Sequence, residues 1–212
     1  MILSLIGNNL TCTRGDTTVF SALDFSVEPG DALIVRGANG SGKSSLLRLT
    51  AGYLAPTKGE LRRDGVLVSE EPERHLTRLH YVGHLDALKP AFTAVENLTF
   101  WSRLFSGETV PAASISHALD RMGLSALSDM PTHYLSAGQR RRLALARLVA
   151  SSRPLWLLDE PTASLDDAGS ETLIELIAEH RLGGGMVMAA VHGGLAVPDV
   201  TTVQLGRQGP GS

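Results

Sequence analysis

GANGSGKS at residues 37–44 is the stretch that decides the fold class of this chain. It satisfies the pattern G-x-x-x-x-G-K-[ST], in which glycines let the backbone wrap tightly and turn its N–H groups toward phosphate oxygens. The apolar run DALIVRG at 31–37 predicts a buried strand before it, and residues 43–51 predict a helix after it. Because a phosphate loop needs this strand–loop–helix order, the context supports a nucleotide site.

The residues expected to surround the nucleotide phosphates are Gly37, Ala38, Asn39, Gly40, Ser41, Gly42, Lys43, Ser44 and Ser45. Lys43 is expected to reach the β- and γ-phosphates, and the hydroxyl of Ser44 to bind Mg²⁺. A second motif, PLWLLDE at 154–160, predicts an apolar strand ending in two acids. Asp159 would hold Mg²⁺ beside the loop, and Glu160 would polarise the water that attacks the γ-phosphate. These two motifs alone leave kinases, GTPases and transporter ATPases as candidates.

The composition is that of an ordinary globular protein. Of the 212 residues, 43% are hydrophobic and 19% are charged, so the chain can bury one well-packed core. The net charge of −3 gives the whole chain no electrostatic preference for nucleic acid. A single cysteine, Cys12, excludes an intramolecular disulfide. No apolar run approaches the roughly 18 residues of a membrane span, so we expect a cytosolic chain that other subunits hold at any membrane.

Strands alternate with helices along much of the chain, which predicts an α/β fold around a mostly parallel sheet. A hairpin that turns at Asp64 and Gly65 predicts additional, antiparallel strands. Thr93 and Glu96 predict a capping box at the start of a helix. We expect a single domain over 1–212, with a core formed by 1–83 and 151–212 and an inserted helical subdomain at 84–150.

The motif LSAGQ at 135–139 narrows the candidates, and it precedes a basic helix with arginines at 140–142. The free N–H groups at the start of that helix can receive an anion. The chain has no second phosphate loop, so its own nucleotide is held at 37–44, far away in the sequence. The arginines are expected to pair with nearby acids, lie on the subdomain surface or help present the loop, because no aromatic residue alternates with them.

With these motifs, the chain resembles the ATP-binding-cassette (ABC) family over essentially its whole length. GANGSGKS corresponds to the Walker A loop, LSAGQ to the signature loop and LLDE to the Walker B strand; Ala163-Ser164-Leu165-Asp166 corresponds to the D-loop, and His192 to the switch histidine. The resemblance implies an α/β P-loop NTPase fold of the ABC type, with a mostly parallel core, an antiparallel β subdomain and an inserted helical subdomain. It also implies a head-to-tail dimer that hydrolyses ATP with Mg²⁺.

In such a dimer, the signature residues of one subunit would act on the ATP of the other: Leu135, Ser136, Ala137, Gly138 and Gln139. Ser136 and Gly138 would cap the γ-phosphate that Lys43 of the other subunit holds. The resemblance makes Glu160 the catalytic base and His192 a clamp on the γ-phosphate and the water. Ser164, Leu165 and Asp166 would form the D-loop at the same interface.

Two positions depart from the common pattern of the family. The residue that stacks on adenine is usually aromatic, and the best match here is Arg14, before Gly15. A guanidinium can also lie over a base, so Arg14 is either an adenine contact or a plain surface arginine. At the Q-loop, His84 replaces the usual glutamine. Neutral imidazole can accept a hydrogen bond from a metal-bound water, so we keep His84 among the catalytic candidates.

Four segments resemble the ATP-binding subunits of haem exporters used in cytochrome c maturation: YVGH at 81–84, LKP at 88–90, TAVENLTFW at 93–101 and LSAGQRRRLALARL at 135–148. This resemblance implies integral-membrane permease partners and a peripheral position on the cytoplasmic face of the bacterial inner membrane. The groove at about 85–101 would meet those partners, with Phe92 and Trp101 as possible anchors, although Trp101 could instead pack the subdomain. No direct haem binding is expected, because His80 and His84 straddle a strand end.

Three alternatives compete with this assignment. Another small-molecule or lipid ABC transporter would share every catalytic residue and differ only in partner and substrate. A soluble ABC protein acting on nucleic acid or ribosomes would carry two cassettes or a long coiled-coil insertion, and this chain has neither. A monomeric P-loop kinase or GTPase would have no use for LSAGQ or the D-loop.

Overall fold

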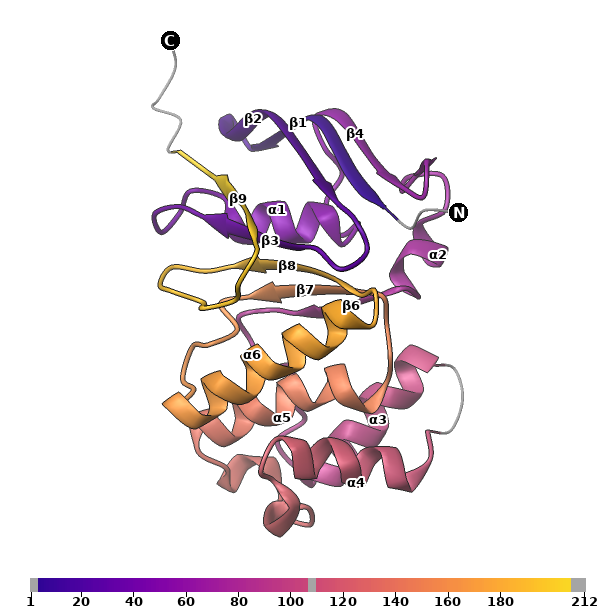
Figure 1. Cartoon of the computed structure of the whole chain (residues 1–212), viewed down its shortest axis with the longest axis vertical. Coiled ribbons are helices and arrows are strands. Elements are labelled where there is room, and N and C mark those ends of the chain that lie inside the picture. The colour runs from indigo at the N-terminus through magenta and orange to yellow at the C-terminus, as the bar shows by residue number, and fades with distance from the viewer. Residues whose placement is uncertain (1–3, 107–109, 207–212) are drawn as a thin grey trace.

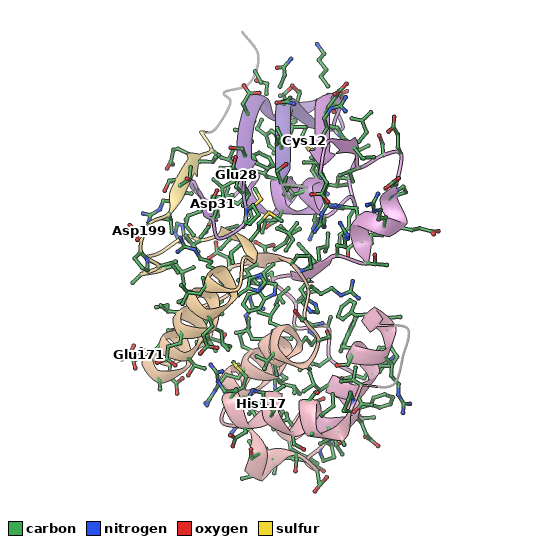
Figure 2. The ribbon with its side chains drawn as sticks, turned by 45° about the vertical axis from the view of Figure 1, so that its right-hand side comes forward. Cys12, Glu28, Asp31, His117, Glu171 and Asp199 are labelled. Atoms are coloured by element: carbon green, nitrogen blue, oxygen red, sulfur yellow. The ribbon has the colours of Figure 1, made fainter. Side chains whose placement is uncertain are left out.

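The computed structural model describes residues 4–106 and 110–206 and has two sheets with helices between and below them (Figure 1). The first sheet is antiparallel, in the order β2-β1-β4-β5, and comprises β1 Leu5–Arg14, β2 Thr17–Val27, β4 Lys58–Arg63 and β5 Val66–Leu67. The predicted turn at Asp64 and Gly65 joins β4 to β5, and both residues have positive φ. Cys12 lies buried in this sheet as a free thiol (Figure 2).

The second sheet is parallel, in the order β6-β7-β8-β3-β9, and comprises β3 Ala32–Arg36, β6 Leu79–Val82, β7 Leu155–Asp159, β8 Met186–Ala190 and β9 Thr201–Gln204. Every residue of β7 and β8 is buried, as expected for parallel strands covered on both faces. The helix α1, Lys43–Thr50, lies between the two sheets in Figure 1. These features confirm the predicted α/β fold with its mostly parallel core.

The remaining helices are α2 Pro72–Leu76, α3 Ala94–Ser106, α4 Ala112–Arg121, α5 Ala137–Ala150 and α6 Asp167–Leu182, with short 3₁₀ turns at Ser125–Leu127 and Thr132–Tyr134. The sequence analysis did not predict α2, whose five residues are too few for a periodic pattern. The capping box before α3 is confirmed, because Thr93 Oγ1 accepts from the Glu96 N–H and Glu96 Oε2 accepts from the Thr93 N–H. Among the described residues, no helix combines the length and apolar character that crossing a bilayer requires.

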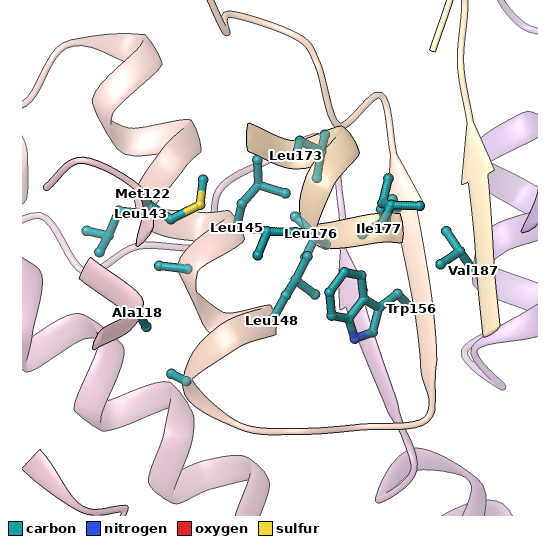
Figure 3. Packing of buried hydrophobic residues seen from close by; sticks show 14 of the residues in the cluster. Ala118, Met122, Leu143, Leu145, Leu148, Trp156, Leu173, Leu176, Ile177 and Val187 are labelled. Carbon is teal, nitrogen blue, oxygen red and sulfur yellow. The ribbon is translucent and has the colours of Figure 1, made fainter. Parts of the chain in front are cut away.

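A continuous apolar cluster joins the helices α3 to α6 to one face of the parallel sheet. Leu145 and Leu148 of α5 lie beside Leu176 of α6 and Trp156 of β7, whereas Leu143 lies on the side of Met122 (Figure 3). Burial of side chains of this size contributes roughly 1.5–3 kcal/mol each. Because α5 packs directly on the sheet, its N-terminus has a fixed position relative to the strand ends. The subdomain boundaries at 84 and 150 stay a prediction.

Candidate functional site

The predicted site residues converge because three parallel strands end at one edge of the sheet. β8 lies between β3 and β7, and the register aligns Val35 with Ala190 and Ala190 with Asp159. The phosphate loop follows β3, Glu160 follows β7 and His192 lies two residues beyond β8. The carboxyl edge of a parallel sheet is where open α/β folds bind ligands. Residues far apart in sequence are therefore neighbours here.

The phosphate loop has the backbone that its glycines permit. Gly40 and Gly42 have φ values of 80° and 100°, in a region that residues with a side chain rarely adopt. A Cβ on Gly42 would lie 2.4 Å from the Cγ1 of Val19, so the loop also presses closely on β2. Lys43 is 7% exposed, and its Nζ donates to the carbonyl of Gly37 at 2.9 Å. The ammonium group of Lys43 thus lies over its own loop, in a position to contact a bound phosphate.

Ser44 and Asp159 form the pair expected to hold Mg²⁺. The Oγ of Ser44 donates to Oδ1 of Asp159 over 3.0 Å. Asp159 is 1% exposed, and its Oδ2 is a buried atom with no hydrogen-bond partner. No cluster of three His, Cys, Asp or Glu side chains within 4–106 and 110–206 is arranged to hold a metal. One carboxylate, one hydroxyl and an unsatisfied oxygen nevertheless fit Mg²⁺, which takes few protein ligands and completes its shell with phosphate and water.

Glu160 is held from several sides. It has a φ of 48°, an uncommon value for a residue with a side chain. Its N–H donates to the carbonyl of Ala190 at 2.9 Å. Its Oε2 accepts from the N–H of His192 at 3.0 Å, and its Oε1 lies 3.7 Å from Nζ of Lys43. The carboxylate therefore lies between Lys43 of the phosphate loop and the backbone of His192.

A cleft of about 680 Å³ opens between these groups. Its lining residues are Arg14, Val19, Asn39, Gly40, Gly42, Lys43, Ser44, Ser45, His84, Glu160, Ala163 and His192. The structure thus brings both departures from the common pattern, Arg14 and His84, to the cleft that contains the phosphate loop. No Phe, Tyr or Trp is among these lining residues, and Arg14 stays the predicted candidate for an adenine contact. The sequence analysis did not identify Val19 as a lining residue, because nothing in the sequence distinguishes it from other valines in strands.

The signature loop lies apart from this cleft, since 135–139 are absent from its lining. Ser136 is the N-cap of α5, and its Oγ accepts from the Gln139 N–H while Oε1 of Gln139 accepts from the Ser136 N–H. Because Oγ accepts in this capping box, its O–H proton remains available for an anion. Leu135 is buried in the apolar cluster, whereas Ser136 and Ala137 are exposed.

The D-loop lies directly beside the signature loop of the same chain. A Cβ on Gly138 would come within 2.8 Å of the Ser164 carbonyl oxygen. Ser164 has a φ of 65°, and Leu165 packs against the apolar cluster. Asp166 caps α6 by accepting from the Gly169 N–H, and it lies 3.7 Å from Nη2 of Arg142.

Of the three alternatives expected for the arginines at 140–142, a surface position is wrong for Arg141, which is 3% exposed; Arg147 on the same helix is buried as well, at 4%. Consecutive helical residues are rotated by about 100°, so three arginines in a row cannot all face solvent when the helix packs on a sheet. This helical periodicity is the feature of the sequence from which the burial of one arginine could have been predicted. The expectation of pairing with acids holds in part, for Arg141 with Asp86 at 3.3 Å and for Arg142 with Asp166.

A second cavity, of about 550 Å³, lies on the other side of His84. It includes Leu85 and Trp101 from the predicted partner surface, whereas Phe92 lines a neighbouring hollow. Trp101 is half-buried: its Nε1 donates to the carbonyl of Ala87, and the guanidinium of Arg147 stands 4.8 Å from its ring centre. Burial lowers the pKa of Arg147 to about 10, which still leaves it charged at neutral pH. Leu85 is 81% exposed.

Comparisons with known proteins agree with this geometry. The ABC transporter family matches residues 20–163. The cytochrome c biogenesis ATP-binding export protein CcmA of Paramagnetospirillum magneticum is 48% identical over 93% of this chain and 91% of its own length. The protein of the same name from Rhodospirillum rubrum is 47% identical over 96% and 86%, respectively. An ATP-binding cassette solved as a dimer in a post-hydrolysis state with ADP and phosphate has a TM-score of 0.82 at 22% identity, over 95% of this chain and 94% of its own.

The family match covers the phosphate loop, the signature loop and the strand that ends at Asp159, and the curated relatives extend the similarity over nearly the whole chain. This chain therefore belongs to the ABC transporter family, as an ATP-binding subunit.

Proposed function

We propose that this chain is the ATP-hydrolysing motor of a haem exporter complex in c-type cytochrome biogenesis. The observation that carries the proposal is the identity of 48% to a cytochrome c biogenesis ATP-binding export protein over 93% of the chain. The cleft supplies the chemistry, because it holds Lys43, Ser44, Glu160 and His192 around one volume that can accept a triphosphate. ATP binding would close a dimer, and hydrolysis would reset it.

Each group in the cleft has a role that follows from its position. The N–H groups of 37–45 would surround the phosphates, and Lys43 would exchange its loop carbonyls for phosphate oxygens. Ser44 and Asp159 would hold Mg²⁺, which neutralises phosphate charge when bound. Glu160 would accept a hydrogen bond from the attacking water and orient it. His192 and His84, both on the wall of the cleft, would bind the γ-phosphate and the water from either side.

The site would be completed by a second copy of the chain. Ser136 offers an O–H and stands at the start of α5, where free N–H groups and the helix dipole favour an anion. Because the signature loop is absent from the lining of its own cleft, we infer that Ser136 and Gly138 act on the ATP of the partner, with Ser164, Leu165 and Asp166 beside them. Two such sites would form in a head-to-tail dimer. Residues 84–150 would move as the helical subdomain.

The cavity beside Trp101 is the surface proposed to meet integral-membrane subunits. Its lining includes Arg48, Arg147 and Arg153 together with exposed apolar groups, and no acid. Such a lining suits a segment with apolar side chains and a carboxylate, since aromatic and arginine residues are the usual anchors of interfaces. His84 lines both this cavity and the ATP cleft, so a partner docked here would lie next to the nucleotide. We infer a peripheral position on the cytoplasmic face of the bacterial inner membrane.

Two experiments test the proposal at different levels. The purified chain is expected to hydrolyse ATP only with Mg²⁺, and Lys43→Ala to lose this activity; retained turnover in the variant would refute the site. Deletion of the gene in its native bacterium is expected to remove all c-type cytochromes, detected by haem staining, and wild-type but not Glu160→Gln protein to restore them. Normal cytochromes in the deletion strain would favour an ABC transporter of another small molecule or lipid, with the ATPase assignment intact.

A further inference from the structure

Arg141 makes more side-chain hydrogen bonds than any other buried charged residue among the described residues, and it does not line the ATP cleft. It lies on α5, five residues beyond the N-cap Ser136, and is 3% exposed. Its Nε donates to the carbonyl of Pro161 at 3.2 Å. Its Nη2 donates to the carbonyls of Asp159 and Glu160 at 2.9 and 2.8 Å.

The remaining nitrogen reaches a different segment. Nη1 donates to the carbonyl of Gly83 at 2.8 Å and lies 3.3 Å from Oδ1 of Asp86. A guanidinium has five N–H donors in one plane, and here each of them has an acceptor. Four of the five acceptors are backbone carbonyls. One side chain therefore fixes the backbone on both sides of the ATP cleft, after β7 and after β6.

The contact of Arg141 with three consecutive carbonyls bears on ATP hydrolysis, because these carbonyls surround the proposed catalytic base. The carbonyls of 159–161 all turn toward Arg141, and the residue in the middle of that turn is Glu160, with its φ of 48°. A residue in this region persists when its surroundings hold it there. The N–H of Glu160 donates to Ala190, and its carbonyl accepts from Arg141. These two hydrogen bonds fix the backbone of Glu160 and thereby the direction in which its carboxylate points.

We propose that Arg141 is a positioning residue for ATP hydrolysis, which holds Glu160 in its reactive direction and fixes the segment that carries His84. This inference rests on the catalytic role proposed for Glu160. Neither lysine nor glutamine can replace the contact, because lysine has three donors at one point and glutamine has two. A positioning role predicts that loss of Arg141 slows the chemical step selectively, whereas a purely structural role predicts only a loss of stability.

Arg63 offers a matched control for that structural role. It is 5% exposed and also donates to backbone carbonyls, those of His75 and Arg78, in the region of the antiparallel sheet. Arg141→Gln and Arg63→Gln both remove a buried guanidinium that binds carbonyls. Only the first lies next to the ATP cleft, so only the first should change the chemical step.

The test measures ATP turnover, ATP affinity and the thermal midpoint of the full chain with Mg²⁺. Arg141→Gln is expected to bind ATP within about threefold of wild type and to lower kcat by about ten- to a hundredfold, the scale of a misplaced catalytic group. Arg63→Gln, with a comparable loss of thermal midpoint, is expected to keep kcat within about threefold. An equal fall of kcat in both variants would overturn the proposal.

A double variant separates this inference from the function of Glu160 itself. If Arg141 acts through Glu160, adding Arg141→Gln to Glu160→Gln is expected to lower kcat by no more than about twofold further, because coupled residues are not additive. Full multiplication of the two single effects would show that Arg141 acts independently and would overturn the inference. If Glu160→Gln alone keeps wild-type turnover, the proposed base is wrong, and the inference, which depends on it, fails with it.

Discussion

Two buried histidines are expected to make the fold sensitive to mild acid. His75 and His80 are 2% and 1% exposed. Burial lowers the pKa of His75 from 6.5 to about 4 and that of His80 to about 3, against a smaller opposite effect of the carbonyls that their Nε2 atoms bind, Thr50 and Ser151. The folded chain therefore keeps both rings neutral at pH 5, whereas the unfolded chain protonates them.

The sign and size of the effect follow from proton counting. Between pH 6.5 and the folded pKa values, the unfolded state binds more protons, so the free energy of unfolding falls as pH falls. Above pH 6.5 the contribution is fully present. From pH 7 to pH 5, each ring changes the free energy of unfolding by about 2 kcal/mol, since one pKa unit corresponds to about 1.4 kcal/mol. Together they amount to about 4 kcal/mol, a large part of the roughly 5–15 kcal/mol typical of a domain.

Urea unfolding at pH 5, 6, 7 and 8 measures this dependence. His80→Gln is expected to flatten the pH profile by about 2 kcal/mol between pH 7 and 5, whatever its effect at pH 7, because glutamine does not titrate. Arg147, Arg153 and His180 act on His80, but they are present in both proteins and cancel in the comparison. His117→Gln, at an exposed position of α4 (Figure 2), is expected to keep the wild-type profile. Parallel profiles for wild type and His80→Gln would refute the reasoning.

Three further changes test the ATP site. Gly138→Ala places a Cβ 2.8 Å from a backbone oxygen, and we expect turnover to fall at least about tenfold with ATP affinity nearly unchanged, measured by fluorescent-nucleotide titration. Ser44→Ala removes the hydroxyl on Asp159 and is expected to raise the Mg²⁺ concentration for half-maximal hydrolysis about tenfold. Arg14→Ala is expected to weaken ATP binding by about 0.5–1 kcal/mol and Arg14→Tyr to restore it, since a ring can replace a guanidinium over a base; unchanged affinity in Arg14→Ala would make it a plain surface arginine.

The sequence predicts those parts of the fold that depend on local patterns. The loop at 37–44, the turn at Asp64 and the capping box at Thr93 each involve residues close in the chain, and the structure contains all three. Asp159 was placed beside the loop because parallel strands share one edge, which is a general rule of such sheets. The confirmed predictions therefore rest on short-range chemistry or on fold topology.

The sequence does not reveal contacts that depend on how a helix is rotated against its neighbours. Arg140, Arg141 and Arg142 are chemically identical in the sequence, yet only Arg141 is buried against the strand ends. Which of the three faces inward is set by the packing of Leu143 and Leu145 in the apolar cluster. In the same way, the sequence left Trp101 as either a partner anchor or a packing residue of the subdomain, and only the three-dimensional structure shows Arg147 over its ring.

The position of Arg141 on α5 has a consequence for the coupling of two ATP sites. Ser136 and Arg141 are separated by five residues of one helix, about 7.5 Å along its axis. Ser136 is the group proposed to contact the partner's ATP, whereas Arg141 holds Glu160 in the chain's own cleft. Since a helix moves as a rigid element over this distance, a displacement of the signature loop would also displace the carbonyl contacts of Glu160. With the role proposed for Ser136, Arg141 would therefore link the two half-sites of one chain, and its buried carbonyl contacts leave it no part in a basic surface for nucleic acid.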